Sequence, residues 1–423
     1  MSRVPIATGG PSVLDGYRAV VGDGPVRVLE ALARRLRDHR LVMVNSTAIG
    51  GGVAEILHRL VRLLLELGVP TTWEVMAGDA PFYAFTKALH NALHGIEAPL
   101  TDEARAHYHA MNERAARELE LNGDLVLIHD PQPAALVLHR RTPGQRWVWR
   151  CHVDLSHARP EAWELLAPLV AHYDAAVFSH PAFVPPMAVP AYLVPPSIDP
   201  FSDKNRELPE PDVERLLEPF ALPDHVPLVT QVSRFDRLKD PVGVVDAFAI
   251  LRRRARAHLV LAGGSADDDP EGAEVLAEVR ARAAGRDDVS LLALPPDAHL
   301  VINALQHRSH VVVQKSLREG FALTVAEALW KRRAVVASAV GGIPLQVLHN
   351  RTGLLVRSIE GCADAVVRLL EAPELRRRLG AEGREHVRDN FLHTREARDY
   401  LAVFLALGAA APGPAPAAVA AAG

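Results

Sequence analysis

The sequence predicts an α/β protein of two doubly wound, Rossmann-like domains, and three observations support this prediction. The chain has 423 residues, whereas one domain mostly holds about 100–200 residues. From residue 40 onward, short runs rich in β-branched residues alternate with amphipathic helical stretches, as in parallel βα units. The segment 184–202 is dense in proline and divides this alternation into two halves.

Each half contains strand candidates separated by helical patterns. In the stretch VAEILHRLVRLLLELG (53–68), leucine and valine recur at three- and four-residue spacing, and Gly68 ends the pattern. This spacing indicates an amphipathic helix between two strands. The predicted strands are residues 41–46, 71–78, 124–130, 146–153 and 175–180 in the first half, and 226–235, 257–264, 288–294, 310–316 and 333–342 in the second.

The proline-rich segment marks the predicted domain boundary. Prolines stiffen an extended chain, so we place the crossing between domains near Pro195–Pro200. The two sheets are expected to face each other across a cleft at their carboxyl ends, where open α/β sheets bind ligands. The expected organisation is a first domain at 1–195, a second at 196–388, a helix at 389–408 that packs back on the first domain, and a disordered tail at 409–423.

Composition and charge argue against several classes of protein. Hydrophobic residues make up 49% and charged residues 23% of the chain, an ordinary globular balance. The net charge of −4, without a long basic run, argues against a nucleic-acid partner. Cys151 and Cys362 lie far apart and outside metal-binding spacings, which fits a reducing compartment. We find no signal-peptide pattern and no apolar run long enough for a membrane span, so we expect a cytoplasmic protein.

A glycine-rich turn follows the first predicted strand. In VNSTAIGGGVAEIL (44–57) the strand ends at Asn45, and Gly50, Gly51 and Gly52 precede a helix that begins at Val53. Backbone N–H groups at such a turn can approach a phosphate, and the helix start adds partial positive charge. The alternative is a tight turn of any Rossmann unit. The turn is not a Walker motif, because no Gly-Lys-Ser/Thr follows.

Two cations follow the first strand of the second half. The segment SRFDRLKDP places Arg234 and Lys239 between that strand and a helix whose first turn contains Pro241. Two such cations can clamp a diphosphate and neutralise it as a leaving group without a metal. Alternatively, both are solvated surface residues.

Paired glutamates occur in QKSLREGFALTVAEALWK (314–331). Glu319 and Glu327 flank seven residues, with the first in a strand-to-helix turn and the second on the following helix. Carboxylates at these positions can accept hydrogen bonds from ribose and sugar hydroxyls. Lys315 can reach a phosphate or pair with a glutamate, and Gly341–Gly342 forms a second candidate anion cradle. Either glutamate alone could instead be a capping or surface residue.

Histidine and carboxylates follow two strands of the first half. Asp130 lies in HDPQP (129–133), and Arg150, His152 and Asp154 lie in WRCHVDLS (149–156). The histidine could serve a sugar hydroxyl, the aspartates could orient an acceptor, and the arginine could hold charge nearby. A structural histidine is the alternative. We interpret the acidic run Asp267–Asp269 as a solvated loop rather than a metal site, because its neighbours are glycine and other polar residues.

Together these motifs resemble family 4 of the retaining glycosyltransferases. Within that family the similarity is greatest to the glycosyltransferring trehalose synthases, and it extends from about Leu41 to Leu401. The segments that carry the resemblance are VNSTAIGGGVAEIL, TKALHNALHG (86–95), HDPQP, WRCHVDLS, QKSLREGFALTVAEALWK, VGGIPLQV (340–347) and NFLHTREARDYL (390–401).

The resemblance implies a GT-B fold and transfer of glucose from a nucleoside diphosphate to free glucose, forming trehalose with retention. It implies an acceptor-binding first domain, a nucleotide-sugar-binding second domain, no cofactor or required metal, and a plausible homodimer. Arg234 and Lys239 would hold the diphosphate, Glu319 a donor hydroxyl and Glu327 the ribose, while His152 would lie near the transferred sugar.

The full expectation for the site has three sets. The catalytic set is His152, Arg234, Lys239 and Glu319. The donor set is Gly51, Gly52, Arg234, Lys239, Lys315, Glu319, Gly320, Phe321, Glu327, Gly341 and Gly342. The acceptor set is Asn45, Lys87, Asp130, Arg150, His152 and Asp154.

One departure from the family pattern and three competing functions qualify this resemblance. Ala322 stands where the family usually has a second glycine, which leaves the donor preference open. The first competing function is that of a retaining trehalose phosphorylase, which shares the fold and much of the donor motif and uses phosphate in place of the nucleotide. The second is that of a family 4 enzyme with a different acceptor. The third is that of a non-catalytic sugar- or nucleotide-binding module.

Overall fold

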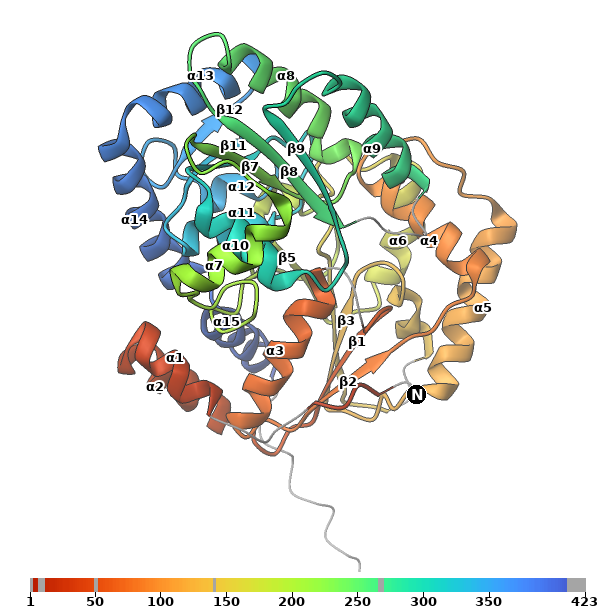
Figure 1. Ribbon diagram of the computed structural model, residues 1–423. Helices are drawn as coiled ribbons and strands as arrows, with labels where there is room; N and C mark the ends of the chain where they lie inside the picture. Colours follow the sequence, from red (N-terminus) through yellow and green to blue (C-terminus); the bar gives the residue numbers. More distant parts are fainter. Residues whose placement is uncertain (1–2, 7–11, 49–51, 140–141, 265–269, 409–423) are drawn as a thin grey trace, which may run out of the picture. The chain divides into compact units, whose positions relative to one another are not determined.

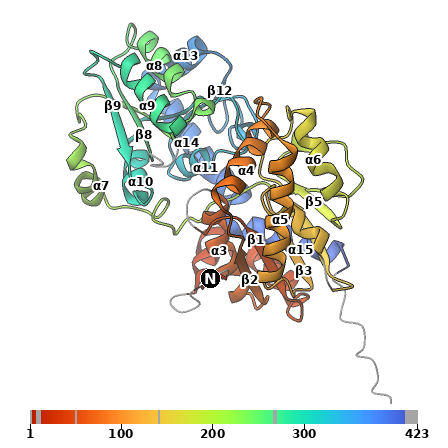
Figure 2. The ribbon, with the colours of Figure 1, turned by 90° about the vertical axis from the view of Figure 1, so that its right-hand side faces the viewer.

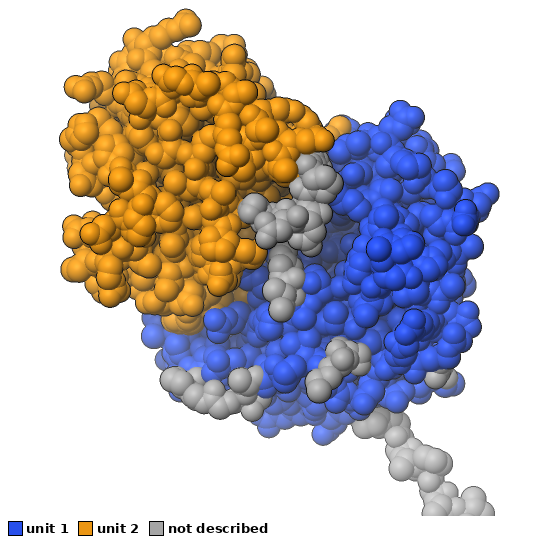
Figure 3. Space-filling model, turned by 45° about the vertical axis from the view of Figure 1, so that its right-hand side comes forward, with its two compact units in different colours: residues 1–194, 394–423 blue, residues 195–393 orange. Residues whose placement is uncertain are grey.

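The chain folds into two compact units. The computed structural model describes residues 3–6, 12–48, 52–139, 142–264 and 270–408 (Figure 1). Unit 1 comprises Met1–Val194 and Thr394–Gly423, and unit 2 comprises Pro195–His393 (Figure 3). Each unit contains one six-stranded sheet covered by helices (Figures 1 and 2), so the α/β class and the doubly wound architecture are confirmed.

Unit 1 is built on the strand order β2-β1-β3-β4-β5-β6, with every neighbouring pair parallel. The direction of winding reverses between β1 and β3, and such a reversal is where open α/β sheets bind ligands. The strands are β1 (Leu41–Asn45), β2 (Thr71–Val75), β3 (Leu125–His129), β4 (Arg146–Arg150), β5 (Ala175–Phe178) and β6 (Ala191–Leu193).

Alternation along the strands divides the side chains of unit 1 between two faces. Val126 and Ile128 of β3 pack with Phe82 and Tyr108 in one apolar cluster, while the intervening residues point to the other face. In Figure 2, α4 and α5 run side by side along this unit. The helices are α1 (Val13–Val21), α2 (Asp23–Arg34), α3 (Gly52–Glu66), α4 (Ala80–Leu93), α5 (Asp102–Glu118), α6 (Pro160–Val170) and α15 (His393–Ala406), with short 3₁₀ turns at η1 (Ala134–His139) and η2 (Pro181–Phe183).

Unit 2 has the strand order β12-β11-β10-β7-β8-β9, again parallel throughout. This is the Rossmann order, and the winding reverses between β7 and β10. The strands are β7 (Leu228–Val232), β8 (His258–Gly264), β9 (Val289–Leu294), β10 (Val311–Gln314), β11 (Ala334–Ser338) and β12 (Leu354–Val356). The helices are α7 (Glu210–Leu217), α8 (Pro241–Leu251), α9 (Pro270–Arg282), α10 (His299–Arg308), α11 (Leu323–Trp330), α12 (Ile343–Gln346), α13 (Ile359–Glu371) and α14 (Pro373–Asn390), with 3₁₀ turns η3 (Glu218–Phe220) and η4 (Arg237–Lys239).

The sixth strand of each sheet, β6 and β12, was not predicted. Each has three residues, which is too short to show a strand periodicity in the sequence. Several predicted strands also extend too far: the run 146–153 ends as a strand at Arg150, and the run 71–78 ends at Val75. The residues beyond those ends form the loops that carry polar side chains.

The chain passes between the units after Val194 and again after His393. Within unit 2 the two crossing segments are joined, because Ile198 N–H donates to the Phe391 carbonyl at 2.8 Å and Ser197 Oγ lies 2.5 Å from His393 Nδ1. The ring of Phe391 lies 5.4 Å from the ring of Phe321, and Phe321 lies in the loop after β10. Among the helices described, none is long and apolar enough to span a membrane.

Candidate active site

In unit 2, charged side chains gather where β7 and β10 end. Lys239 Nζ donates to Glu319 Oε2 at 2.6 Å, and the Ser316 hydroxyl donates to the same carboxylate at 3.2 Å. Lys315 Nζ donates to Asp240 Oδ2 in a second ion pair. Two cations and two carboxylates are therefore interleaved at the winding reversal of this sheet. Lys315 and Glu319 are 7% and 8% exposed, so the ion pairs are protected from most solvent screening.

Asp240 is the residue of this group that the sequence analysis missed. It adopts a left-handed backbone (φ 48°) and caps α8 by accepting a hydrogen bond from Gly243 N–H at 3.0 Å. A Cβ at Gly243 would lie 2.3 Å from Asp240 Oδ2, so a larger residue there would displace the capping carboxylate. The position between Lys239 and Pro241 is a sequence signal for a helix N-cap that could have identified it.

Arg234 and Glu327 lie at opposite extremes of exposure. The Arg234 side chain is 59% exposed and donates to Asp236 at 3.2 Å, so its guanidinium can reach a ligand in solvent. Glu327 lies on α11 and is 1% exposed. The structure therefore brings Lys239, Lys315 and Glu319 together, and it buries the Glu327 side chain on the adjoining helix α11.

The glycine pair after β11 packs against the loop after β10. A Cβ at Gly341 would lie 1.6 Å from the Glu319 carbonyl oxygen, and one at Gly342 would lie 2.4 Å from that of Gly320. Gly341 also has a positive φ of 53°. The helix that follows, α12, has four residues. Close approach of two loops thus explains this glycine pair, in addition to the anion cradle that the sequence suggested.

In unit 1, polar side chains meet where β3 and β4 end. His129 Nδ1 lies 3.1 Å from His152 Nε2, and the two rings stack at 5.4 Å with planes 15° apart. Asp130 has a φ of 66°, and its carboxylate accepts a hydrogen bond from the backbone N–H of His152 at 2.8 Å. Burial raises the pKa of Asp130 to about 6. Asp130 therefore fixes the loop that carries His152.

Arg150 is fully buried beside this pair. It is 0% exposed, it lies opposite His129 in the parallel register of β3 and β4, and Nη2 donates to Ser179 Oγ at 3.2 Å. Its Nε and Nη1 have no hydrogen-bond partner among the described residues. Burial, and then the charge of Arg150, lowers the pKa of His129 to about 3 and that of His152 well below its usual value.

The other predicted acceptor residues hold local structure or lie in solvent. Asn45 accepts from Trp73 Nε1 at 2.8 Å and donates to the Thr47 carbonyl at 2.7 Å, which secures the end of β1. Asp154 accepts from the Ser156 backbone at 2.9 Å. Lys87 is exposed on α4. Gly52 begins α3, whereas Gly51 and the acidic run Asp267–Asp269 lie outside the described residues.

The sequence analysis also missed His129, which directly precedes Asp130 at the end of β3. Its signal was available, since a polar residue closing an apolar strand lies at the edge where ligands bind. The pairing of His129 with His152 could not be read from the sequence, because it depends on the register of two strands about 20 residues apart.

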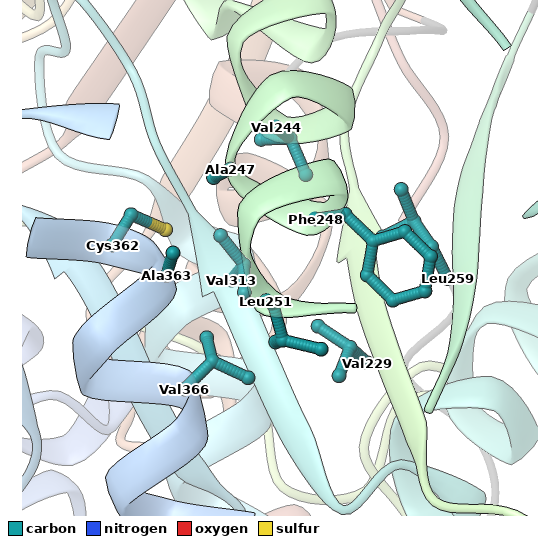
Figure 4. A pocket seen from close by; sticks show the side chains of 10 residues that line it. All are labelled: Val229, Val244, Ala247, Phe248, Leu251, Leu259, Val313, Cys362, Ala363 and Val366. Atoms are coloured by element: carbon teal, nitrogen blue, oxygen red, sulfur yellow. The ribbon is translucent and has the colours of Figure 1, made fainter. Parts of the chain in front are cut away.

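An apolar void in unit 2 is separate from both sites. It is lined by β7, β8 and β10 and by helices α8 and α13, with Val229, Phe248 and Cys362 among its walls (Figure 4). Its volume of about 10 Å³ holds about one water molecule and no sugar. Burial raises the pKa of Cys362 to about 12, so this thiol is unreactive. Among the side chains described, no group of three or more His, Cys, Asp or Glu residues could hold a metal ion.

Two Rossmann-like units, each built on a parallel six-stranded sheet, are the architecture of the GT-B glycosyltransferases. Residues 212–386 match the family described as "Glycosyl transferases group 1", and residues 43–185 match "Trehalose synthase, N-terminal domain". The fold resembles that of an α,α-trehalose-phosphate synthase from Burkholderia vietnamiensis, with a TM-score of 0.70 and 19% identity over 87% of this chain and 98% of that one.

The chain belongs to the trehalose synthase family of glycosyltransferases. It is 42% identical to a trehalose synthase of Rubrobacter xylanophilus over 407 residues, which cover 94% of this chain and 98% of the relative. A trehalose phosphorylase of Pleurotus pulmonarius is a weaker relative, with 30% identity over 89% of this chain and 58% of its own length. The protein is therefore an enzyme of the glycosyltransferase class.

Proposed function

We propose that the protein transfers glucose from a nucleoside-diphosphate glucose, such as UDP- or ADP-glucose, to free glucose, forming trehalose reversibly and with retention. The paired charges at the end of β7 and β10 are the observation that carries this proposal, because Lys239 and Lys315 are held at the edge where a Rossmann unit binds phosphate. The trehalose synthase relative covers nearly the whole chain.

Unit 2 supplies the donor half of the proposed reaction. Arg234 and Lys239 bind the diphosphate and stabilise its negative charge as it leaves, a role that needs no metal. Glu319, held by Lys239, accepts a hydrogen bond from a hydroxyl of the sugar that is transferred. We assign Glu327 to the ribose, on the resemblance of its motif.

Unit 1 supplies the acceptor half. Because the pKa of His152 is lowered by burial and by Arg150, its imidazole is neutral, and the ring nitrogen that faces away from His129 can hydrogen-bond a sugar hydroxyl. The Asp130 carboxylate orients the loop of His152 by accepting a hydrogen bond from the His152 backbone N–H. Arg150 supplies positive charge at the same strand end.

The proposed mechanism is attack on the same face of the donor sugar. The bond between the glucosyl carbon and the diphosphate oxygen breaks as the acceptor hydroxyl oxygen bonds to that carbon, and the departing oxygen takes the acceptor proton. No carboxylate is singled out by motif and position as a covalent nucleophile, so the protein contributes orientation and charge stabilisation. Exclusion of water from the bound donor would prevent its hydrolysis.

A competing proposal is a retaining phosphorylase, which the Pleurotus relative keeps open. In that reaction inorganic phosphate replaces the nucleotide, and trehalose yields glucose 1-phosphate. The same lysines would serve either anion, so the two reactions differ in the anion that is bound and are distinguished by assay.

A single assay decides between these reactions. The purified protein is incubated with glucose and, in parallel, UDP-, ADP- and GDP-glucose, and the disaccharide is identified by NMR. Trehalose plus phosphate is assayed alongside for glucose 1-phosphate. An α,α-1,1 disaccharide from any nucleotide donor supports the proposal and names the donor. Phosphorolysis alone would assign the phosphorylase, and a different glucoside would change the acceptor.

We further propose a cytoplasmic location and activity without a divalent metal. The two cysteines are free and buried, which suits a reducing compartment. Trehalose formation should persist in EDTA, and its loss would show that a metal takes part. A homodimer remains our proposal on the resemblance, and light scattering of the pure protein tests it.

A further inference from the structure

The two histidines at the acceptor end of unit 1 share one hydrogen bond. His129 Nδ1 and His152 Nε2 are 3.1 Å apart. Burial and Arg150 lower the pKa of both rings, so both are neutral at pH 7. A neutral imidazole has one N–H and one lone pair. One ring must therefore donate and the other accept, and the direction of this bond fixes the tautomer of both.

The surroundings of His129 decide that direction. His129 is 2% exposed, and its Nε2 has no hydrogen-bond partner in the part of the chain that the structure describes. A buried N–H without an acceptor is rarer in proteins than an under-used acceptor. Nε2 is thus the better place for the lone pair, which leaves the proton on Nδ1, facing His152.

Arg150 reinforces this choice electrostatically. It occupies the register position opposite His129, on the same face of the sheet, and its buried Nε and Nη1 also lack partners among the described residues. A nearby positive charge favours a lone pair over an N–H dipole. Glu396 of α15 acts in the opposite sense on His129, but its effect on the pKa of that ring is smaller than the effect of Arg150.

We propose that His129 is a positioning residue that donates from Nδ1 to His152 Nε2 and so holds His152 as the Nδ1–H tautomer. His152 is partly exposed, and no described residue binds its Nδ1. His152 therefore offers a hydrogen-bond donor, not an acceptor, to a sugar oxygen. The substrate in this step rests on the proposed function, whereas the tautomer itself does not.

NMR of the protein labelled with ¹⁵N-histidine tests the tautomer directly. Long-range ¹H–¹⁵N correlations distinguish protonated from unprotonated ring nitrogens, and the His152 and His129 signals are assigned from their absence in His152→Asn and His129→Asn. The expected result is a proton on Nδ1 of each ring. A proton on Nε2 of His152 would overturn the proposal, whatever reaction the enzyme catalyses.

Kinetics with matched variants tests the positioning role. The Asn side-chain N–H can replace the His Nδ1–H, so His129→Asn should keep kcat within about threefold of the wild type, whereas His129→Leu should lower kcat at least about tenfold with donor KM little changed. Equal kcat values in these two variants would overturn the role. Leu127→Ala is the control, since Leu127 is fully buried on the same face of β3 and its truncation removes packing without removing a polar atom.

The outcomes separate this inference from the proposed function. A wild-type protein that makes no trehalose from any nucleotide donor contradicts the proposed function, and the NMR result still decides the tautomer. A wild type that makes trehalose but shows His152 protonated on Nε2 contradicts this inference alone. If Leu127→Ala lowers kcat as much as His129→Leu does, the effect is one of packing and the positioning role is wrong.

Discussion

Ala322 holds a backbone conformation that suits glycine. It lies at the N-terminus of α11 with φ 69° and ψ 76°, a region that costs a residue with a Cβ about 1–2 kcal/mol. Glycine there gains flexibility in the unfolded chain, which offsets part of the relief. We expect Ala322→Gly to raise the free energy of unfolding by about 0.5–1 kcal/mol, measured by urea denaturation.

Asp240 provides the control for that substitution. Its φ is also positive, at 48°, but its side chain caps α8 and binds Lys315. Asp240→Gly should therefore destabilise the protein although it relieves the same kind of strain. A fall in stability for Ala322→Gly as well would show that no strain is stored at Ala322.

Because Arg234 is exposed, we expect its substitution to lower activity while leaving stability nearly unchanged. In the part of the chain that the structure describes, its ion-pair partner is Asp236, and its side chain is 59% exposed, so Arg234→Ala should change the free energy of unfolding by less than about 0.5 kcal/mol. Loss of a group that stabilises the leaving diphosphate should lower kcat/KM at least about 100-fold. Steady-state kinetics with the nucleotide donor measures this.

Arg237 is the matched control, three residues further along the same loop. Its guanidinium binds Glu278 with contacts of 2.8 and 2.9 Å, whereas Lys239 binds Glu319. Arg237→Ala should keep near-wild-type kcat/KM. Near-wild-type turnover in Arg234→Ala would remove this residue from the donor clamp.

At the scale of elements, the backbones of the loops after β10 and β11 are in close contact. Gly341→Ala would place a Cβ against the Glu319 carbonyl and force a residue with a side chain to adopt φ 53°. We expect the Glu319 loop to move, donor KM to rise about tenfold, and stability to fall by about 1–3 kcal/mol. Donor KM and urea denaturation check both effects.

Gly285→Ala distinguishes backbone strain from loop contact. Gly285 has φ 74°, and a Cβ there would meet nothing within 4 Å. This variant should lose about 1–2 kcal/mol of stability while donor KM stays unchanged. If both variants raise donor KM equally, or neither does, the contact between the two loops has no role in donor binding.

Local sequence patterns predicted the positions of the longer strands well and the contacts between them poorly. Arg234, Lys239 and Glu319 were recognised because each follows an apolar run that ends in a turn, and the structure places all three at one sheet edge. The pairing of Lys315 with Asp240 depends on β7 and β10 being neighbours, which no local pattern encodes. For the same reason the glycines at 341–342 suggested an anion cradle, whereas the structure also reveals their packing against another loop.

At the scale of the whole molecule, the connections between units bear on the donor loop. Both crossing segments are joined within unit 2, where Ile198 bonds to Phe391, and Phe391 packs on Phe321. Phe321 follows Glu319 and Gly320 in the sequence, so the donor loop contacts a crossing segment through these two rings. A substitution at Phe391 would therefore change the packing around the loop that carries Glu319.

Buried ionisable groups also set how the stability of the whole protein depends on pH. His129 has a pKa of about 3 because of burial and Arg150, and burial with nearby cations lowers the pKa of His307 and His310 to about 4. Below about pH 6.5 the unfolded chain binds protons at these histidines and the folded chain does not, so stability is lost as pH falls. Asp130 opposes them, since its raised pKa makes its contribution decline as pH rises through about 6.

The lowered pKa of His152 acts in the same direction as those of these three histidines, so we expect the free energy of unfolding to be lower at pH 5.5 than at pH 7.5. His129 alone should account for about 1 kcal/mol of that decrease, because one pH unit below the unfolded pKa corresponds to about 1.4 kcal/mol for a group that stays neutral when folded. His129→Asn should reduce the decrease by this amount, and exposed His157→Asn should leave it unchanged. Urea denaturation of the three proteins at both pH values measures the difference. An equal decrease in wild type and His129→Asn would mean that His129 is protonated in the folded protein, which would also remove the neutral histidine pair from the acceptor site.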